Sequence, residues 1–258
     1  MWAERIAPID ELATARSLSA EPGFAWLDSH RSDARDGRYS FLAAWPEDEI
    51  SVAFGAESPF SPLAEVGRPT ETVNLEGPKP NQVPQWIGYI AYDAFWTAPV
   101  RGTARFERPQ DPIVFFRYYP ALLAIDHLDG SVWIVGDDEG VCRGFRKWLE
   151  HSQQPRTIRP AVGRLHVDDA AQHRSVIVKA LDYIARGDVY EVNLARRWAA
   201  KFEGSASELW QAMREASRVP LGMFLDAGER AVLACTMERF VRWHAESRTL
   251  VTRPIKGT

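Results

Sequence analysis

The residue types best suited to chemistry lie close to the end of the sequence. Residues 253–258 read RPIKGT, in which Lys256 offers an amine beside Gly257 and Thr258. Glycine lets a ligand approach the backbone closely, and a threonine hydroxyl can donate a hydrogen bond to a carboxylate. A lysine amine titrates near ~10.4, so it becomes a nucleophile only where its pKa is lowered. Glu238 supplies a carboxyl group that acts as an acid where its pKa is raised. Taken alone, both are typical of solvated surface groups.

Two short strands would bring the amine and the carboxyl group together. The segments 240–245 and 249–253 flank a turn at residues 246–247, and this pattern predicts an antiparallel hairpin. Counting outward from that turn places Glu238 opposite Ile255. The lysine then lies one position further along, near the glutamate but not directly opposite it.

Several other kinds of chemistry leave no signature in the sequence. The histidines are scattered without a pair at i, i+4, so they do not suggest a metal site: His30, His127, His151, His166, His173 and His244. There is no glycine-rich phosphate loop and no nucleophile elbow. Cys142 and Cys235 lie in different segments without metal-ligand spacing, and we predict that both are unpaired thiols.

Composition narrows the class of protein further. The chain has 258 residues, of which 45% are hydrophobic and 26% charged, which is typical of a globular protein. The net charge of −4 argues against a nucleic-acid partner, because such proteins usually carry a clustered basic excess. No apolar run approaches the ~20 residues that cross a bilayer, and no apolar segment follows the charged start at residues 1–5. We therefore expect a cytoplasmic protein without a membrane partner.

The chain divides into two predicted parts, residues 1–160 and 161–258. The first part reads as short strands separated by turns, and the polar segment 152–160 is the candidate boundary. The second part opens with a helix that ends at Gly187, where glycine can adopt a positive φ without cost.

The remaining pattern of the second part is one of short strands around a single helix. We predict a strand at 189–198, a helix opened by a capping box at 205–208, and strands at 223–226, 231–236, 240–245 and 249–253. Together the two parts predict an α+β fold, an antiparallel β-sandwich with flanking helices.

Three segments of the second part carry a resemblance to chorismate-utilising enzymes. Residues 253–258 resemble the substrate-site signature of that family, and residues 187–194 (GDVYEVNL) are similar to an early strand of its catalytic domain. Residues 238–240 match the end of the family's Ser-Pro-Glu-Arg-Phe element. The central Lys256 resembles aminodeoxychorismate synthase component I, since anthranilate and isochorismate synthases usually carry alanine there.

The first part resembles the N-terminal domain of the same family. Residues 26–29 and 37–42 look like the segments that form a tryptophan pocket in relatives, which implies that Ser29, Tyr39 and Ser40 line such a pocket. An ordinary sandwich strand would show the same alternation of residues. The resemblance thus implies an anthranilate synthase component I-like fold in which only the first part of the catalytic domain is present.

The resemblance also implies a reaction and its participants. Chorismate and ammonia would give 4-amino-4-deoxychorismate for para-aminobenzoate and folate biosynthesis, with ammonia supplied by a glutaminase subunit or domain. Lys256 would be the nucleophile and Glu238 the acid, while Gly257 and Thr258 would bind the substrate. The ligands of the family's Mg²⁺ would lie beyond residue 258, so we expect no metal ligands within this chain and no turnover by the chain alone.

Two departures and two alternatives accompany this interpretation. Residues 235–237 (CTM) stand where relatives carry Ser-Pro, which puts the position of the following glutamate in doubt, and Glu191 replaces a usual glutamine. One alternative is an anthranilate synthase component I of tryptophan biosynthesis. The other is a non-catalytic module that binds tryptophan or docks onto a partner.

Overall fold

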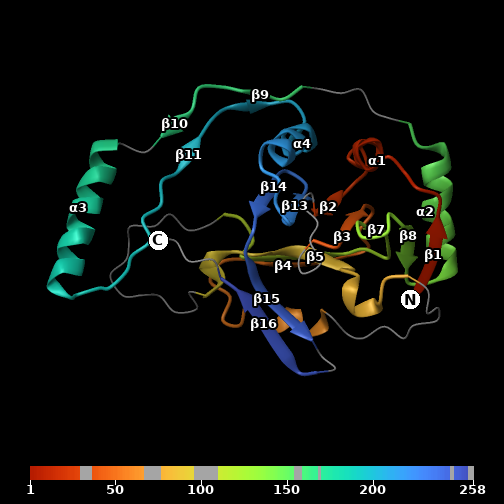
Figure 1. The fold of residues 1–258 in the computed structure, drawn as a ribbon, viewed down its shortest axis with the longest axis horizontal. Helices are drawn as coiled ribbons and strands as arrows, with labels where there is room; N and C mark the ends of the chain where they lie inside the picture. The colour runs from red at the N-terminus through yellow and green to blue at the C-terminus, as the bar shows by residue number, and fades with distance from the viewer. Residues whose placement is uncertain are drawn as a thin grey trace. The chain divides into compact units, whose positions relative to one another are not determined.

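The computed structural model describes residues 1–29, 37–66, 77–95, 110–153, 159–167, 170–244 and 247–254. These residues form two compact units, which we describe separately (Figure 1). The first unit comprises Met1–Arg156 and Trp210–Thr258, and the second comprises Thr157–Leu209. None of the described helices combines the length and apolar character that spanning a membrane requires.

The first unit is built on an antiparallel sheet of seven strands. In sheet order these are β1 (Trp2–Ile6), β8 (Val132–Gly136), β7 (Ala121–Asp126), β3 (Tyr39–Ala43), β2 (Ala25–Asp28), β13 (Leu221–Asp226) and β14 (Ala231–Thr236). The interior strand β7 is buried along its whole length, because both faces of the sheet are covered.

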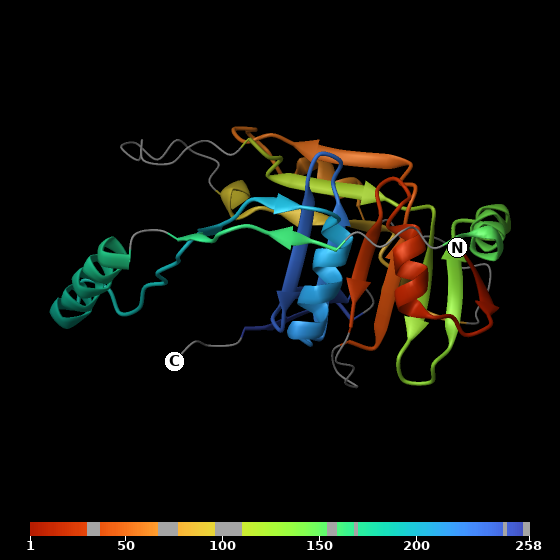
Figure 2. The ribbon, with the colours of Figure 1, turned by 90° about the horizontal axis from the view of Figure 1, so that it is seen from above.

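A smaller antiparallel sheet covers one of those faces. It contains, in order, β4 (Asp48–Val52), β6 (Val114–Tyr118) and β5 (Trp86–Ile90). Its strands run across those of the larger sheet (Figure 2). Ile87 and Phe115 of the smaller sheet join Phe41, Leu122 and Leu225 of the larger one in a single buried apolar cluster. The predicted α+β sandwich is confirmed.

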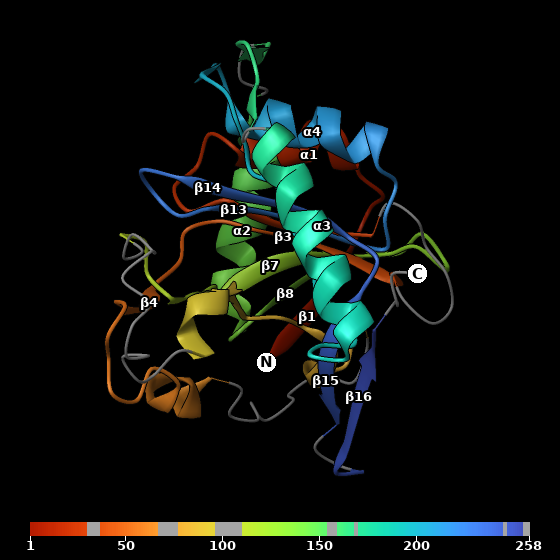
Figure 3. The same ribbon diagram turned by 90° about the vertical axis from the view of Figure 1, so that its left-hand side faces the viewer.

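Helices pack beside the larger sheet of the first unit. α1 (Glu11–Leu18) begins at the N-cap Asp10, whose carboxylate accepts from the Ala13 N–H at 3.0 Å. α2 (Glu139–His151) packs against β8 and β1, and Figure 3 shows α1 beside α4 (Ala206–Ala216). The described part of this unit also contains three short 3₁₀ helices: η1 (Ser61–Glu65), η2 (Pro80–Gln82) and η3 (Tyr92–Phe95).

The described residues of the second unit form one whole helix, two short strand pairs and the first residues of α4. The strands are β9 (Ala161–Val162) with β12 (Phe202–Glu203), and β10 (His166–Val167) with β11 (Trp198–Ala199). The predicted helix is confirmed as α3 (Ala170–Arg186), and Gly187 has a φ of +76°. The strand predicted at 189–198 is wrong over residues 189–197, which pair with no other strand in the described structure.

A two-stranded ribbon projects from the end of β14, formed by β15 (Arg239–His244) and β16 (Thr249–Arg253) (Figure 1, Figure 3). Both strands agree closely with the predicted hairpin. The compact units do not coincide with the predicted parts, because β13 and β14 lie beyond residue 160 and still complete the seven-stranded sheet. The division into residues 1–160 and 161–258 therefore stays a prediction about sequence modules.

Candidate functional site

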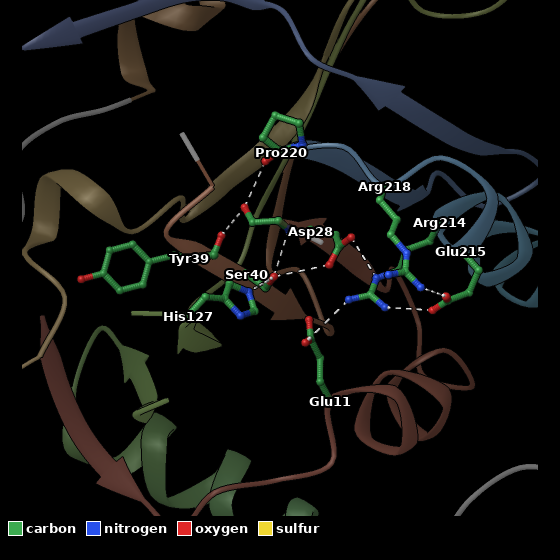
Figure 4. A network of polar contacts seen from close by, with 10 residues as sticks. Glu11, Asp28, Tyr39, Ser40, His127, Arg214, Glu215, Arg218 and Pro220 are labelled. Atoms are coloured by element: carbon green, nitrogen blue, oxygen red, sulfur yellow. Dashed lines mark hydrogen bonds and ion pairs between the residues drawn. The ribbon is translucent and has the colours of Figure 1, made fainter. Parts of the chain in front are cut away.

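The end of β2 brings two of the predicted pocket residues together. Ser29 directly follows β2, and its N–H donates to the Ser40 hydroxyl of β3 at 3.0 Å. Both residues are buried, Ser40 completely. Ser29 Oγ lies 2.8 Å from the Tyr39 carbonyl and 3.2 Å from the Pro220 carbonyl (Figure 4). A hydroxyl has a single proton, so Ser29 can satisfy only one of these two carbonyls at a time.

Tyr39 contributes its carbonyl to this point and directs its ring elsewhere (Figure 4). The ring lies 5.8 Å from that of Phe41 and 4.8 Å from the guanidinium carbon of Arg38. Burial and the neighbouring Asp126 carboxylate raise the pKa of the Tyr39 hydroxyl. The predicted pocket residues therefore gather through two hydroxyls and one backbone carbonyl, without the tyrosine ring.

The Ser40 hydroxyl connects this point to charged groups. It lies 2.7 Å from His127 Nε2, just after β7, and donates to Asp28 Oδ1 at 3.4 Å. Asp28 is the last residue of β2 and is 2% exposed. A buried carboxylate needs a paired cation, which comes from the next helix along the network.

Arg214 of α4 supplies that cation. Its Nε donates to Asp28 Oδ2 at 2.9 Å, and its guanidinium carbon lies 5.0 Å from the centre of the Trp26 ring. Two further carboxylates approach the same guanidinium, Glu11 at 3.8 Å and Glu215 at 3.6 Å (Figure 4). We call the residues Glu11, Asp28, Ser40, His127 and Arg214 the arginine cluster.

Sequence reasoning missed Arg214, although a signal was present. The buried positions of α4 are Ser207, Trp210, Gln211 and Arg214, which follow the i, i+3, i+4, i+7 spacing of one helical face. An arginine four residues after a tryptophan lies on the same face as that tryptophan. Because its neighbours on this face are largely polar, the apolar pattern did not reveal it.

Glu238 lies at the base of the ribbon, just before β15. It is exposed, and its backbone N–H donates to the Thr236 hydroxyl at 3.1 Å. Lys256, Gly257 and Thr258 lie outside the described residues, so the structure does not place them relative to the glutamate.

The ribbon carries a register shift that the sequence did not predict. His244 pairs with Thr249 and Arg242 with Val251, which is the predicted register, but beyond a bulge Arg239 pairs with Arg253. Continuing that pairing places Glu238 opposite Pro254, one residue earlier than predicted. The register predicted without a bulge is therefore wrong at Arg239, because the bulge adds one residue to β15. Ile255, the predicted partner of Glu238, lies outside the described residues.

The described residues show neither a metal site nor a reactive Cys142 thiol beside the arginine cluster or the ribbon. Within the described ranges, no three side chains of His, Cys, Asp or Glu gather as a metal site would require. Cys142 and Cys235 are both free thiols, as predicted. Burial raises the pKa of Cys142 to about 12, so its thiol is not reactive at neutral pH.

Comparison with known protein families shows which family the chain belongs to. The sequence profile of the family described as "chorismate binding enzyme" matches residues 24–258, which is most of the chain. The chain belongs to this chorismate-binding family. The match covers the arginine cluster from Asp28 onward, the ribbon, and the Lys256 segment.

Individual relatives carry two different names. The chain is 24% identical to an anthranilate synthase component I-like protein of Synechocystis sp. over 86% of this chain and 47% of the relative. It is 26% identical to aminodeoxychorismate synthase component 1 of Klebsiella aerogenes over 93% of this chain and 56% of the relative. The chain therefore spans about half the length of these family members.

A solved structure confirms the fold of the chorismate-binding family. The chain matches anthranilate synthase component I of Streptococcus pneumoniae with a TM-score of 0.67 at 18% identity, over 83% of this chain and 53% of the other. At this identity the likeness establishes an anthranilate synthase component I-like fold, and the choice between the two named activities rests on other grounds.

Proposed function

We propose that this chain carries part of the active site of an aminodeoxychorismate synthase component 1-like enzyme. Such an enzyme converts chorismate and ammonia to 4-amino-4-deoxychorismate, on the route to para-aminobenzoate and folate. Family membership supports chorismate as the substrate, and the likeness to the Klebsiella aerogenes protein supports this member of the family. Lys256 favours it over anthranilate synthase, whose name other relatives carry.

The structural observation that supports the proposal most directly is the bulge in the ribbon. With Arg239 paired to Arg253, Glu238 falls opposite Pro254. Side chains alternate along a strand, so this shift of one residue changes which residues of β16 share a face with Glu238. Bulges recur beside active sites because they redirect side chains in this way.

The proposed reaction uses Lys256 and Glu238 together in its first step. The neutral amine of Lys256 attacks C2 of the ring, and the C4 hydroxyl departs as water with a proton from Glu238. Ammonia then attacks C4 and displaces the lysine, so that the net change is exchange of hydroxyl for amine. Gly257 and Thr258 would contact the substrate.

Both reactive groups need surroundings less polar than water. Burial lowers the pKa of a lysine and raises that of a carboxylic acid, which are the shifts that these roles require. Glu238 is exposed in this chain. We propose that the remaining part of the family fold covers it, and for that reason we expect no turnover by this chain alone.

The remaining participants are proposed from the family resemblance. Ammonia would come from a glutaminase subunit or domain. Mg²⁺ would offset the charge of the substrate carboxylate. The described residues of this chain do not gather a ligand set that fits Mg²⁺.

The test is a chimera in which this chain is followed by the part of the Klebsiella aerogenes relative that the match does not cover. We expect it to form aminodeoxychorismate from chorismate, ammonia and Mg²⁺, detected by trapping with a lyase. Lys256→Ala should abolish the product, and Glu238→Gln should reduce the rate by about 10²–10⁴-fold. Lys201→Ala is the control and should retain full activity. Fluorescent anthranilate as the product, or full activity in Lys256→Ala, would reject the proposal.

A second candidate function, binding of tryptophan, is favoured by the Ser29 hydroxyl. Two carbonyls, of Tyr39 and Pro220, converge on a hydroxyl that can donate to only one of them. An ammonium group has several protons and could donate to both. Calorimetry with tryptophan tests this site in the present chain, with Ser29→Val as the variant that blocks it. No heat at millimolar tryptophan, or equal heat from wild type and variant, would exclude it.

A further inference from the structure

Two carboxylates from different elements compete for the single guanidinium of Arg214. Asp28 of β2 accepts from Nε at 2.9 Å, whereas Glu11 of α1 stands 3.8 Å from Nη2, beyond hydrogen-bond range. The three side chains are 1%, 19% and 7% exposed for Asp28, Glu11 and Arg214. Figure 4 shows Asp28 and Glu11 approaching the guanidinium from different sides.

The second carboxylate is poorly satisfied in its ionised form. Oε1 of Glu11 is buried and accepts no hydrogen bond from the described residues. An ionised oxygen buried without a donor is costly. The guanidinium forms its shorter ion pair, at 2.9 Å, with Asp28. It therefore offsets the charge of Glu11 only in part.

The charged and polar groups around Glu11 come from β2, β3, α4 and the residue after β7. Asp28 raises the pKa of Glu11, and Arg214 and His127 lower it, as does the Ser40 hydroxyl. Glu215 adds a further carboxylate at 3.6 Å from Arg214, with its side chain 53% exposed. Burial is the largest effect, and the net result is that the pKa of Glu11 is raised.

We propose that Glu11 is the proton-binding group of a pH-sensitive latch that holds α1 against α4. When Glu11 is protonated, Asp28 is the one buried carboxylate that pairs with Arg214, and Glu11 adds no uncompensated charge between α1 and α4. When Glu11 is ionised, the buried Asp28 and the partly buried Glu11 share one guanidinium, and the contact between α1 and α4 weakens. Asp28 directly precedes Ser29, so the latch adjoins the point where the Tyr39 and Pro220 carbonyls converge.

The sign of the pH effect follows from the raised pKa. Protonated Glu11 contributes stability that is fully present below the ordinary glutamate value of 4.5 and is lost as pH rises through the higher folded-state pKa. Glu11→Gln mimics the protonated form at every pH. It should therefore match the wild type near pH 4.5 and exceed it at pH 8.

The first experiment is urea unfolding of the 258-residue chain at pH 4.5 and pH 8, followed by tryptophan fluorescence. We expect Glu11→Gln to raise the midpoint urea concentration at pH 8 and to leave it unchanged at pH 4.5. Glu215→Gln is the matched control, since this exposed glutamate approaches the same guanidinium, and it should not raise the midpoint at pH 8. An equal shift at both pH values, or a lower midpoint at pH 8, would overturn the latch.

A second experiment needs no variant and decides the matter if Glu11→Gln fails to fold. The carboxyl carbons of the wild-type glutamates are followed by ¹³C NMR as pH is raised from acid. We expect the Glu11 resonance to titrate at higher pH than those of the exposed glutamates. Titration together with them, or at lower pH, would show that Glu11 holds no proton above its ordinary range.

Discussion

The arginine cluster and the β15–β16 ribbon place their side chains in opposite surroundings. In the cluster, Asp28, Ser40 and Arg214 are each at most 6% exposed, and Asp28 accepts hydrogen bonds from both Ser40 and Arg214. In the ribbon, Trp243 and Leu250 form a cross-strand pair and are 57% and 59% exposed. An isolated two-stranded ribbon is marginally stable in water.

This difference indicates that contacts within the chain stabilise the arginine cluster, whereas few such contacts stabilise the ribbon. The cluster connects β2, β3 and α4 through contacts within the first unit, so we expect it to form in the isolated chain. The ribbon bears Glu238 at its base and exposes apolar side chains on both strands. Variants in the two regions should therefore differ strongly in their effect on the free energy of unfolding.

The largest effect is expected from Arg214→Ala. It removes the guanidinium from Asp28, whose side chain is 1% exposed, and leaves a buried charge without a partner. Breaking a buried pair in this way costs about 3–5 kcal/mol. Urea unfolding at pH 8 measures the loss. Arg218→Ala is the control, because Arg218 is 68% exposed and should lie within about 0.5 kcal/mol of wild type. If the two variants lose equal stability, Arg214 does not hold the cluster together.

Local patterns predicted the elements of both regions but not their long-range pairing. The helix ending at Gly187 and the hairpin around residues 246–247 follow from periodicity and turn chemistry, which depend on near neighbours in sequence. Nothing local indicates that β13 pairs with β2, because that pairing depends on burial across the whole first unit. The predicted parts 1–160 and 161–258 therefore could not reveal the shared sheet.

In the candidate sites, too, local patterns did not predict the contacts between residues far apart in sequence. Ser29 and Ser40 were named through family resemblance, and their role in a pocket stays a prediction. The buried charge pair beside them was not predicted, since periodicity assigns charged residues to the surface. The register near the turn was predicted correctly, as His244 pairs with Thr249. The bulge between Arg239 and Arg242 was missed because no residue type there demands one.

An intermediate effect is expected from Gly222→Ala beside the cluster. A Cβ at this position would lie 2.9 Å from the Trp210 ring and 3.4 Å from the Asp28 Cβ. Because Trp210 is 1% exposed, the ring has little room to move, and overpacking of this kind costs about 1–3 kcal/mol. Gly144→Ala in α2 is the control, since its Cβ would meet nothing within 4 Å and alanine favours a helix by about 0.5–1 kcal/mol. The packing argument fails if Gly222→Ala is as stable as wild type.

The smallest effect is expected from Trp243→Ala in the ribbon. Its ring is 57% exposed, so truncation removes little buried area and should change the unfolding free energy by less than about 0.5 kcal/mol. Trp210→Ala, at 1% exposure, is the matched variant in the cluster region and should lose about 3–5 kcal/mol. Equal losses would mean that the ribbon is buried in solution, for example against a second copy of the chain. In the Klebsiella aerogenes chimera we expect the cost of Trp243→Ala to rise above its value in the isolated chain, because the added part of the fold would cover the ribbon. A cost that stays the same in both proteins would leave Glu238 exposed to water, and its proposed role as an acid would lose its physical basis.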